Sequence, residues 1–174
     1  MNGLIRKLAP IGTMVAAVAI YAGVASGHDG GDNGRGGDRH GGDVLREALA
    51  PSMQGDPMFH NVAPGNVPWL LTRGEARLRL RGKLEIELRG LVIPNPPGDG
   101  TAGPVHTVTA SLYCGADSVM TAVDTTDPVP LSPHGNARIR DRSFNVPTTC
   151  LAPVLLIHPN GDGTRYIAVS GWRR

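Results

Sequence analysis

The sequence has little lysine and few aromatic residues. Lys7 and Lys83 are the only lysines among 17 basic residues, and Phe, Tyr and Trp together make up 4% of the chain. Proteins that bind nucleic acids carry basic stripes, and those that hold single strands interleave them with aromatic side chains that stack on bases. The chain has no such stripe, so we expect no nucleic-acid partner.

Recognisable catalytic and calcium-binding motifs are also missing. The chain has no G-x-S-x-G sequence for a nucleophilic serine. GDGT occurs at 98–101 and 161–164, but each copy supplies one aspartate, whereas a calcium loop needs several spaced carboxylates. Glu85 and Glu87 are surrounded by arginines, which argues against a glycosidase pair. We therefore assign no catalytic residue and no cofactor, and we expect a protein that is not an enzyme.

The histidines follow no metal-binding motif such as H-x-H or H-E-x-x-H. His106, His134 and His158 lie near predicted strand ends or loops, and they would form a metal site if the fold brought them together. Scattered histidines in loops are usually surface residues, and we favour that interpretation.

Only one long hydrophobic run is present, at the N-terminus. Arg6 and Lys7 precede an apolar stretch at 11–24, and small residues surround the following Ala25. This order is typical of a secretory signal peptide, which we place at 1–25. The alternative is a membrane anchor, but the run is shorter than the ~20 apolar residues that a bilayer needs, and no basic stop-transfer cluster follows it. We expect a secreted, extracellular protein without membrane contact after cleavage.

Cleavage would change the charge balance. The full chain has 17 Lys and Arg against 15 Asp and Glu. Removal of Arg6 and Lys7 leaves 15 against 15, so the mature protein would be formally neutral. Segment 26–43 contains eight Gly, four Asp and no hydrophobic residue. Because it has no apolar surface to bury, we expect this segment to be a disordered Gly/Asp-rich linker.

The start of that linker suggests a specific metal site. Cleavage after Ala25 would leave Ser26-Gly27-His28 at the mature N-terminus. The free amine, two deprotonated backbone amides and the imidazole would form a square-planar nitrogen set that suits Cu(II) or Ni(II). Ser26, Gly27 and His28 are therefore candidate metal ligands, on the condition that the bond after Ala25 is cut.

Segment 44–68 is expected to hold a short helix followed by a loop. Asp43 is a good N-cap for the sequence VLREALA, and Pro51 would end the helix. The helix is too short to be stable alone, so it would fray or dock on the following domain. The remainder of the segment, which contains several prolines, is predicted to be a loop.

The clearest structural signal is the sequence EARLRLRGKLEIELRGLVI at 75–93. Leucine and isoleucine occupy the even positions from 78 to 88, and charged residues occupy the odd ones. This period of two predicts strands with one buried face. We interpret the charged side as a solvated outer face. A turn at 81–83 would pair Leu80 with Leu84, Leu78 with Ile86, Arg79 with Glu85 and Arg77 with Glu87.

The rest of the chain contains further short strands. Residues 105–114 alternate, the parity change within 136–147 predicts a bulge near 141–143, and the wholly apolar 153–158 predicts a central strand. NGDG at 160–163 predicts a hairpin turn. The other strand candidates are 118–123 and 165–172. We therefore predict that 69–174 is a single all-β sandwich of about seven or eight strands, with an Ig-like or related Greek-key topology.

The two cysteines, Cys114 and Cys150, are predicted to form a disulfide. An isolated pair in a secreted chain is usually oxidised, and the alternatives, a redox pair or a thiolate metal site, would favour a C-x-x-C arrangement. The bridge would close a loop of 36 residues, for which chain entropy predicts about 3–4 kcal/mol of stabilisation.

Three passages carry a resemblance to known proteins: GEARLRLRGKLEIELRGL (74–91), GNARIRDRSFNVP (135–147) and YIAVSGW (166–172). The chain resembles small secreted proteins of GC-rich Gram-positive bacteria, which share a signal peptide, a variable polar linker and a two-cysteine β domain. It is more distantly similar to chordin-type (CHRD) β domains, in which a G-x-A hairpin ends in GL. The resemblance covers 69–172. The His-x-His of CHRD-type sequences is reduced here to His106, so no functional residue is carried over.

These features together predict a secreted, non-catalytic protein. We expect a monomeric extracellular or cell-wall-associated module that binds an unknown ligand or has a structural role. The first alternative is an extracellular Cu(II)- or Ni(II)-binding protein that uses Ser26, Gly27 and His28. The second is an exported enzyme whose catalytic residues converge only in the folded chain.

Overall fold

The computed structural model describes residues 42–171, and all regular structure in that range is β-strand. The strands of three or more residues are β1 (Asp43–Pro51), β3 (Arg73–Arg79), β4 (Leu84–Arg89), β5 (Thr107–Tyr113), β8 (Ala137–Asp141), β9 (Val154–Pro159) and β11 (Ala168–Ser170). The two-residue strands are β2 (Ala63–Pro64), β6 (Asp124–Thr125), β7 (Val129–Pro130) and β10 (Arg165–Tyr166). The predicted all-β class is confirmed, with 11 strands in place of the expected seven or eight.

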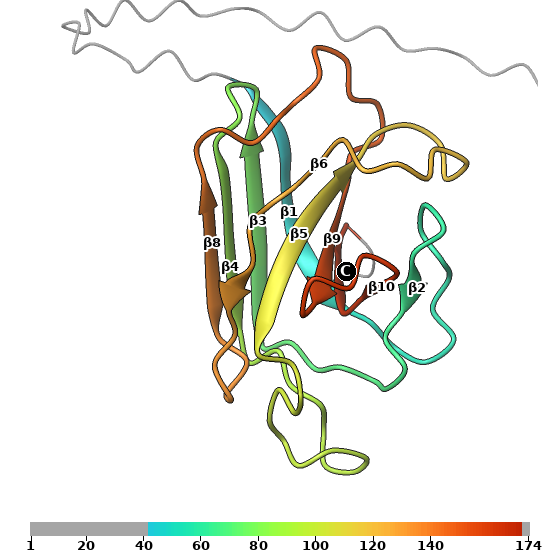
Figure 1. The fold of residues 1–174 in the computed structure, drawn as a ribbon, viewed down its shortest axis with the longest axis vertical. Helices are drawn as coiled ribbons and strands as arrows, with labels where there is room; N and C mark the ends of the chain where they lie inside the picture. The colour runs from blue at the N-terminus through green and yellow to red at the C-terminus, as the bar shows by residue number, and fades with distance from the viewer. Residues whose placement is uncertain (1–41, 172–174) are drawn as a thin grey trace, which may run out of the picture. The chain divides into compact units, whose positions relative to one another are not determined.

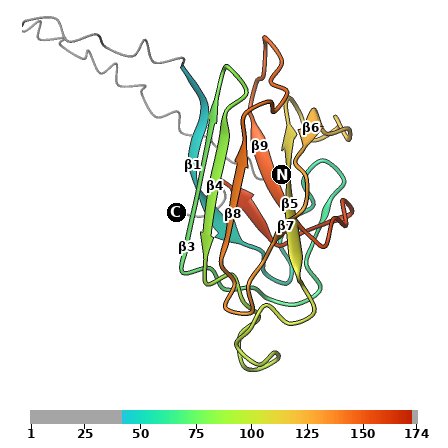
Figure 2. The same ribbon diagram turned by 60° about the vertical axis from the view of Figure 1, so that its left-hand side comes forward.

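The longer strands form one antiparallel sheet that curls into two facing layers (Figures 1 and 2). The strand order is β6-β5-β9-β11-β1-β3-β4-β8, and β7 also pairs with β5. Strand β1 belongs to both layers, because most of it pairs with β3 and its end, Leu49–Pro51, pairs with β11. We call β1-β3-β4-β8 the first layer and β5-β9-β11 the second layer. The predicted sandwich is therefore two halves of one continuous sheet.

The main hydrophobic core lies between the two layers. The even-numbered residues of β3 and β4 point inward, as the alternation predicts, and Leu78 and Leu84 are fully buried. Of the predicted strand at 105–114, Thr107–Tyr113 form β5, and every residue of it except Thr107 is buried, so both of its faces are covered. The second layer fills the core with Val108, Ala110, Leu112, Leu155 and Ile157.

Residues 44–50, predicted as a short helix, are instead part of strand β1. Leu45 and Leu49 are both buried, and their spacing of four fits one face of a helix as well as alternate positions of a strand. In the folded chain this segment hydrogen-bonds to β3 and then to β11. That pairing outweighs a weak local helix preference. The sheet consequently begins at Asp43 and not near Trp69.

The hairpin of β3 and β4 forms as predicted, but its register differs from the prediction by two residues. Leu78 lies opposite Leu84, and Arg77 lies opposite Glu85. Because side chains alternate with a period of two, this shift leaves every strand residue on its predicted face. It changes which residues, charged and apolar, are neighbours across the two strands.

The hairpin turn is longer than predicted and runs from Arg79 to Lys83, where the Arg79 N–H donates to the Lys83 carbonyl over 3.0 Å. Leu80 therefore lies in the turn and is 56% exposed, although the alternating pattern placed it on the buried face. Gly82 has a positive φ of 74°, and a Cβ there would lie 2.3 Å from the carbonyl oxygen of Phe144. Only glycine fits this position without strain.

Residues 118–123, predicted as a short strand, lie in a loop before β6. The Val119 N–H donates to the carbonyl of Ala116 over 2.9 Å, which is a local turn. Val119 and Met120 are 44% and 63% exposed. Residues 118–121 are all exposed, so an extended conformation there would gain little from packing.

The buried positions change from odd to even numbers near 141–143, and the cause is a turn and not the predicted bulge. Strand β8 ends at Asp141. One carboxylate oxygen of Asp141 accepts hydrogen bonds from the N–H and the Oγ–H of Ser143. This side-chain turn redirects the chain, and Phe144 then enters the core with 2% exposure.

The outer face of the second layer is covered by other parts of the chain. Strand β2 pairs in parallel with β10, and these segments pack over the layer together with their loops. They close a second apolar cluster that contains Val62, Tyr113, Leu156, Tyr166 and Val169. Strand β9 lies between β5 and β11 and is buried on both sides, which confirms the predicted central strand at 153–158.

The predicted disulfide is confirmed. Cys114 and Cys150 are bonded, with their Cα atoms 5.0 Å apart. Cys114 directly follows β5, and Cys150 lies in the loop before β9, so the bridge joins a strand end to a loop beside the second layer. The predicted turn at 160–163 is also present, because the Asp162 N–H donates to the Pro159 carbonyl over 2.8 Å.

Candidate ligand-binding face

The outer face of the first layer carries most of the basic side chains of the described chain. The odd-numbered residues of β3 and β4 point outward, as do Arg46 on β1 and the two arginines of β8. We call this surface the arginine face. Its basic residues are Arg46, Arg73, Arg77, Arg79, Lys83, Arg89, Arg138 and Arg140, and its acidic residues are Asp43, Glu75, Glu85 and Glu87.

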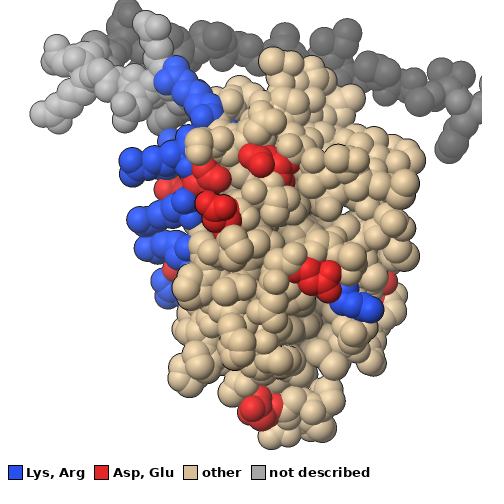
Figure 3. All heavy atoms as spheres, in the orientation of Figure 1, with Lys and Arg blue, Asp and Glu red and all other residues tan. Residues whose placement is uncertain are grey.

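The arginine face differs in charge from the rest of the described chain. It holds eight of the eleven Lys and Arg residues within 42–171, but only four of the twelve Asp and Glu residues. The remaining described surface has three basic and eight acidic residues. Figure 3 shows the basic side chains gathered along the side formed by the first layer, while acidic side chains are spread more widely. A balanced sequence therefore folds into a polarised surface.

The strand register arranges the charges of this face in rows that run across the layer. Arg46 lies beside Arg77, Arg77 beside Glu85, and Glu85 beside Arg140. The next row contains Ala48, Glu75, Glu87 and Arg138. In both rows a glutamate thus occupies the β4 position and an arginine the β8 position, while Arg46 is the basic residue at the β1 side.

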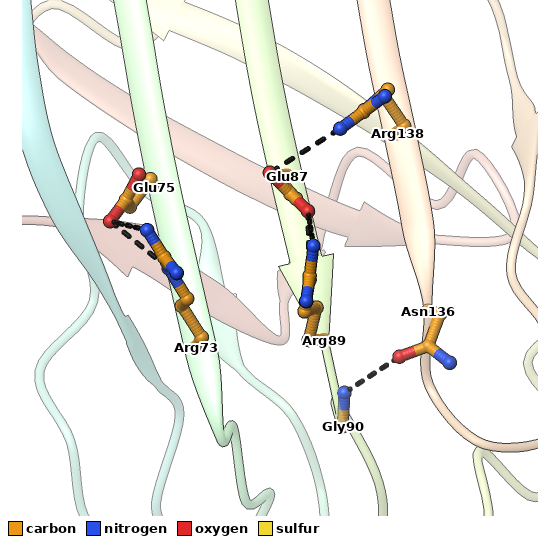
Figure 4. Close-up of polar contacts among 7 residues, drawn as sticks. All are labelled: Arg73, Glu75, Glu87, Arg89, Gly90, Asn136 and Arg138. Carbon is orange, nitrogen blue, oxygen red and sulfur yellow. Dashed lines mark hydrogen bonds and ion pairs between the residues drawn. The ribbon is translucent and has the colours of Figure 1, made fainter.

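Ion pairs on this face run mainly along the strands (Figure 4). Glu75 lies opposite Glu87 across the hairpin, an unfavourable neighbour for each. Each carboxylate instead accepts from an arginine two residues away: Arg73 binds Glu75 at 2.8 Å, and the Arg89 Nε binds Glu87 at 2.7 Å. Arg138 on β8 reaches the other oxygen of Glu87 at 3.5 Å. Two further pairs join Lys83 to Glu85 and Arg77 to Asp43.

These cations lower the pKa values of the carboxyl groups beside them. The hydrogen bond from Arg77 lowers the pKa of Asp43, and the hydrogen bond from Lys83 lowers the pKa of Glu85. Arg89 has the same effect on the pKa of Glu87. The carboxyl groups are therefore ionised at neutral pH, and the face combines fixed positive and fixed negative charges.

Three arginines of this face, Arg46, Arg79 and Arg140, form no ion pair with any described residue. Arg79 is only partly exposed, which leaves Arg46 and Arg140. They lie at opposite ends of one row, three strand spacings apart, which corresponds to about 14 Å between their backbones. Both side chains are exposed, so their guanidinium groups are open to an incoming anion.

The centre of the arginine face is hollowed. A cavity of about 500 Å³ lies over β1, β3, β4 and β8, and Arg46, Arg77, Arg138 and Arg140 contribute to its lining. A second hollow of about 470 Å³ adjoins it, since Glu87 and Arg138 line both. The two hollows together extend along β4 and β8 toward Arg89 and Asn136. This surface could hold an extended ligand.

The three histidines considered as metal ligands do not form a metal site. No group of three or more His, Cys, Asp or Glu side chains within 42–171 is arranged to hold a metal ion. His106 and His134 are exposed, whereas His158 is buried at 1% exposure on β9. The hypothesis of a site formed by these histidines is therefore wrong for the described chain.

His158 is held in one orientation by a backbone contact. Its Nδ1 lies 2.7 Å from the carbonyl oxygen of Arg165, so Nδ1 carries the hydrogen. Its Nε2 is buried and has no hydrogen-bond partner within the described part of the chain. Burial lowers the pKa of His158, and the side chain therefore stays neutral and contributes to packing under the β10 segment.

The two GDGT sequences form matching turns. In each, the aspartate oxygen accepts hydrogen bonds from the N–H at 3.0 Å and the Oγ–H at 2.6 Å of the threonine two residues later. The residues involved are Asp99 with Thr101 and Asp162 with Thr164. These carboxylates stabilise local turns, as the single aspartate per copy predicts.

The signal peptide at 1–25, most of the linker at 26–43 and the candidate metal ligands Ser26, Gly27 and His28 lie outside the described residues. They remain predictions. Within 42–171 no helix exists that could cross a membrane.

The sequence contained a signal for the arginine face that we interpreted as ordinary solvation. The odd positions of 73–89 alternate with buried residues, and the same holds for Arg138 and Arg140 around Ile139. Each strand alone shows only a charged outer side. The basic excess becomes apparent once β8 pairs with β4 and β1 pairs with β3.

Comparisons with other proteins add no relative to this description, and the resemblances noted from the sequence remain expectations. A scan against protein-family models and searches against curated proteins and solved structures each found no match to this chain.

Proposed function

We propose that this protein is a secreted, non-catalytic binding module that holds an anionic partner on its arginine face. The observation that carries the proposal is the separation of charge, with eight of eleven basic residues on one layer of the described chain. A surface with excess positive charge attracts anions and increases their local concentration. The adjoining hollows give this attraction a defined place.

Secretion is supported by two independent features. The N-terminal sequence has the order of a signal peptide. The disulfide between Cys114 and Cys150 is of the kind that persists in oxidising compartments.

The chemistry of the arginine face favours binding over catalysis. A general acid at neutral pH needs a raised carboxyl pKa, whereas the pKa values of Glu85 and Glu87 are lowered by neighbouring cations. Arg46 and Arg140 contribute guanidinium groups, which donate hydrogen bonds but do not accept them. Together these groups provide fixed charges and hydrogen bonds, which are the requirements of an electrostatic binding surface.

Binding to a panel of immobilised polyanions tests this proposal. The panel contains an acidic polysaccharide, heparin, duplex DNA and poly-glutamate, with dextran as the neutral control. We expect wild-type protein to be retained by at least one polyanion at low salt and released at about 0.5 M salt, where charges are screened beyond a few ångströms. The double variant Arg46→Glu/Arg140→Glu should lose retention.

A matched variant controls for net charge. Arg81→Glu/Arg165→Glu makes the same change in charge at two positions outside the arginine face, so it should keep most of the wild-type retention. The proposal fails if wild-type protein binds no polyanion, or if both double variants lose the same amount of binding.

A further inference from the structure

We infer that the ligand of the arginine face is an acidic polysaccharide whose carboxylates are separated by neutral sugar units. This inference rests on the proposed function and specifies its ligand. It follows from how the charges are placed on the face, from the hydrogen-bonding groups between them and from the absence of aromatic side chains in the lining of the hollow.

The placement of charges disfavours a densely charged polyanion. Glu85 lies between Arg77 and Arg140 in one row, and Glu75 and Glu87 lie together in the next. A polymer with an anion on every unit would bring some of its charges against these carboxylates. Duplex nucleic acid, with one charge for each ~1.7 Å of its axis, is the extreme case.

The two exposed arginines of this face without ion pairs favour a ligand whose anionic groups are widely spaced. Arg46 and Arg140 are about 14 Å apart across the layer, with the hollow between them. A carboxylate can accept two parallel hydrogen bonds from one guanidinium group. A polymer whose carboxylates are spaced along it can therefore contact arginines at both sides of the hollow and leave its uncharged units in the middle.

The middle of the hollow offers hydrogen-bond acceptors to a ligand. The carboxylates of Glu75, Glu85 and Glu87 line it, and an ionised carboxylate is an acceptor only, with more sites than one or two ion pairs use. Sugar hydroxyls can donate to these oxygens. The carboxylates of such a polymer would contact the guanidinium groups of the arginine face. Its hydroxyl-rich units would contact the carboxylates of the face.

The lining excludes two other ligand classes. It contains Arg, Glu, Ala and Ile residues only, so a neutral sugar finds no aromatic ring on which to stack and must depend on charged contacts. Ile86 and Ile139 are 2% exposed and offer no pocket for the apolar side chains of a peptide. An acidic polysaccharide needs neither feature.

A series of polymers at equal mass concentration tests the inference with wild-type protein. Hyaluronate carries a carboxylate on every second sugar, and polygalacturonate carries one on every sugar. Heparin, duplex DNA and poly-glutamate are the dense polyanions. We expect hyaluronate to bind most tightly. Reduction of its carboxylates to alcohols should weaken binding by about tenfold or more, as expected when a hydrogen bond to a charged group is lost.

The double variant Glu85→Gln/Glu87→Gln gives a second readout. It removes the charges that repel dense polyanions and the acceptors that hold hydroxyls. We expect weaker binding to hyaluronate and tighter binding to heparin and DNA. A double variant that binds every polyanion more tightly would show that these glutamates only repel, and the inference would be wrong.

The failures of the two proposals can be told apart. If polygalacturonate, heparin, DNA or poly-glutamate binds wild-type protein as tightly as hyaluronate or more tightly, the inferred ligand class is wrong while the binding function stands. If no polyanion binds, both are wrong. A dependence on Arg46 and Arg140 together with a preference for hyaluronate supports both.

Discussion

The two outer faces of the sandwich differ in what covers them. The face of the first layer is open and carries charged side chains on alternate positions. The face of the second layer lies under the segments around β2 and β10, which seal an apolar cluster that contains Leu156 and Tyr166. One face therefore interacts with solvent and solutes, and the other contributes to stability.

The sequences of the strands show the same contrast. Strand β4 reads LEIELR, apolar on one side and charged on the other, whereas β9 reads VLLIHP and is apolar on both sides. A strand needs apolar residues on each face that is covered. The second layer therefore needs apolar residues on both of its faces. The first layer needs them only on its inner face, so its outer face can carry charged residues.

The largest expected loss of stability follows from removal of the disulfide, which lies beside the second layer. Cys114→Ala/Cys150→Ala should lower the free energy of unfolding by about 4 kcal/mol, because the unfolded chain regains the entropy of a 36-residue loop. Equilibrium urea denaturation measures this loss. Reduction of the wild-type bridge should give the same shift, and an unchanged midpoint for the variant would contradict the prediction.

The next effect compares a covered and an open leucine. Leu156→Ala should destabilise the protein by about 3 kcal/mol, because Leu156 is fully buried in the second cluster. Leu80→Ala, the same chemical change at a 56% exposed turn residue, should change stability by less than about 0.5 kcal/mol. Urea denaturation of both variants decides the point, and equal losses would mean that the second face is not sealed.

The pH dependence should also differ between the two faces. Burial lowers the pKa of His158 below its ordinary 6.5, so between 6.5 and the folded value the unfolded chain binds a proton that the folded chain does not. Stability should therefore fall as pH decreases below about 6.5, by at most about 1.4 kcal/mol for each pH unit. His158→Asn, whose amide can still donate to the Arg165 carbonyl, should flatten this slope in unfolding experiments from pH 7 to 5.

The carboxylates of the open face titrate in a separate range. The pKa values of Asp43, Glu85 and Glu87 are lowered by the cations beside them, so the stability they provide is present at neutral pH and is lost only as pH falls below about 4.5. A slope between pH 7 and 5 that persists in His158→Asn would contradict the assignment to His158.

The smallest effect is expected for the open face itself. Arg46→Glu/Arg140→Glu should change the free energy of unfolding by less than about 0.5 kcal/mol, because both side chains are exposed and form no ion pair within the described chain. Thermal unfolding of this variant beside wild-type protein checks the value. A large loss of stability would mean that the arginines hold the sheet together and would weaken their use as binding probes.

Much of the fold could be predicted from local patterns. Alternation identified β3 and β4, a wholly apolar run identified β9, and an isolated cysteine pair identified the disulfide. The register of the hairpin could not be predicted, because a shift of two residues leaves all faces unchanged. The exact turn, from Arg79 to Lys83, depends on how Gly82 meets the backbone of Phe144.

The wrong predictions concern segments whose structure depends on strands far away in the sequence. Residues 44–50 have a helix-like spacing of leucines, yet they pair with β3 and β11, which lie far apart in the sequence. The arginine face was missed for the same reason. Arg140 and Arg46 join one surface only through two intervening strands, and no local pattern encodes that arrangement.

The position of β1 has a consequence for how the chain reaches this structure. Ala50 pairs with Val169, so the pairing that joins the two layers connects residues that lie far apart in the sequence. Contacts between such distant residues slow folding, because a long loop must close before they form. During synthesis the sandwich therefore cannot close until the chain has been made past Val169.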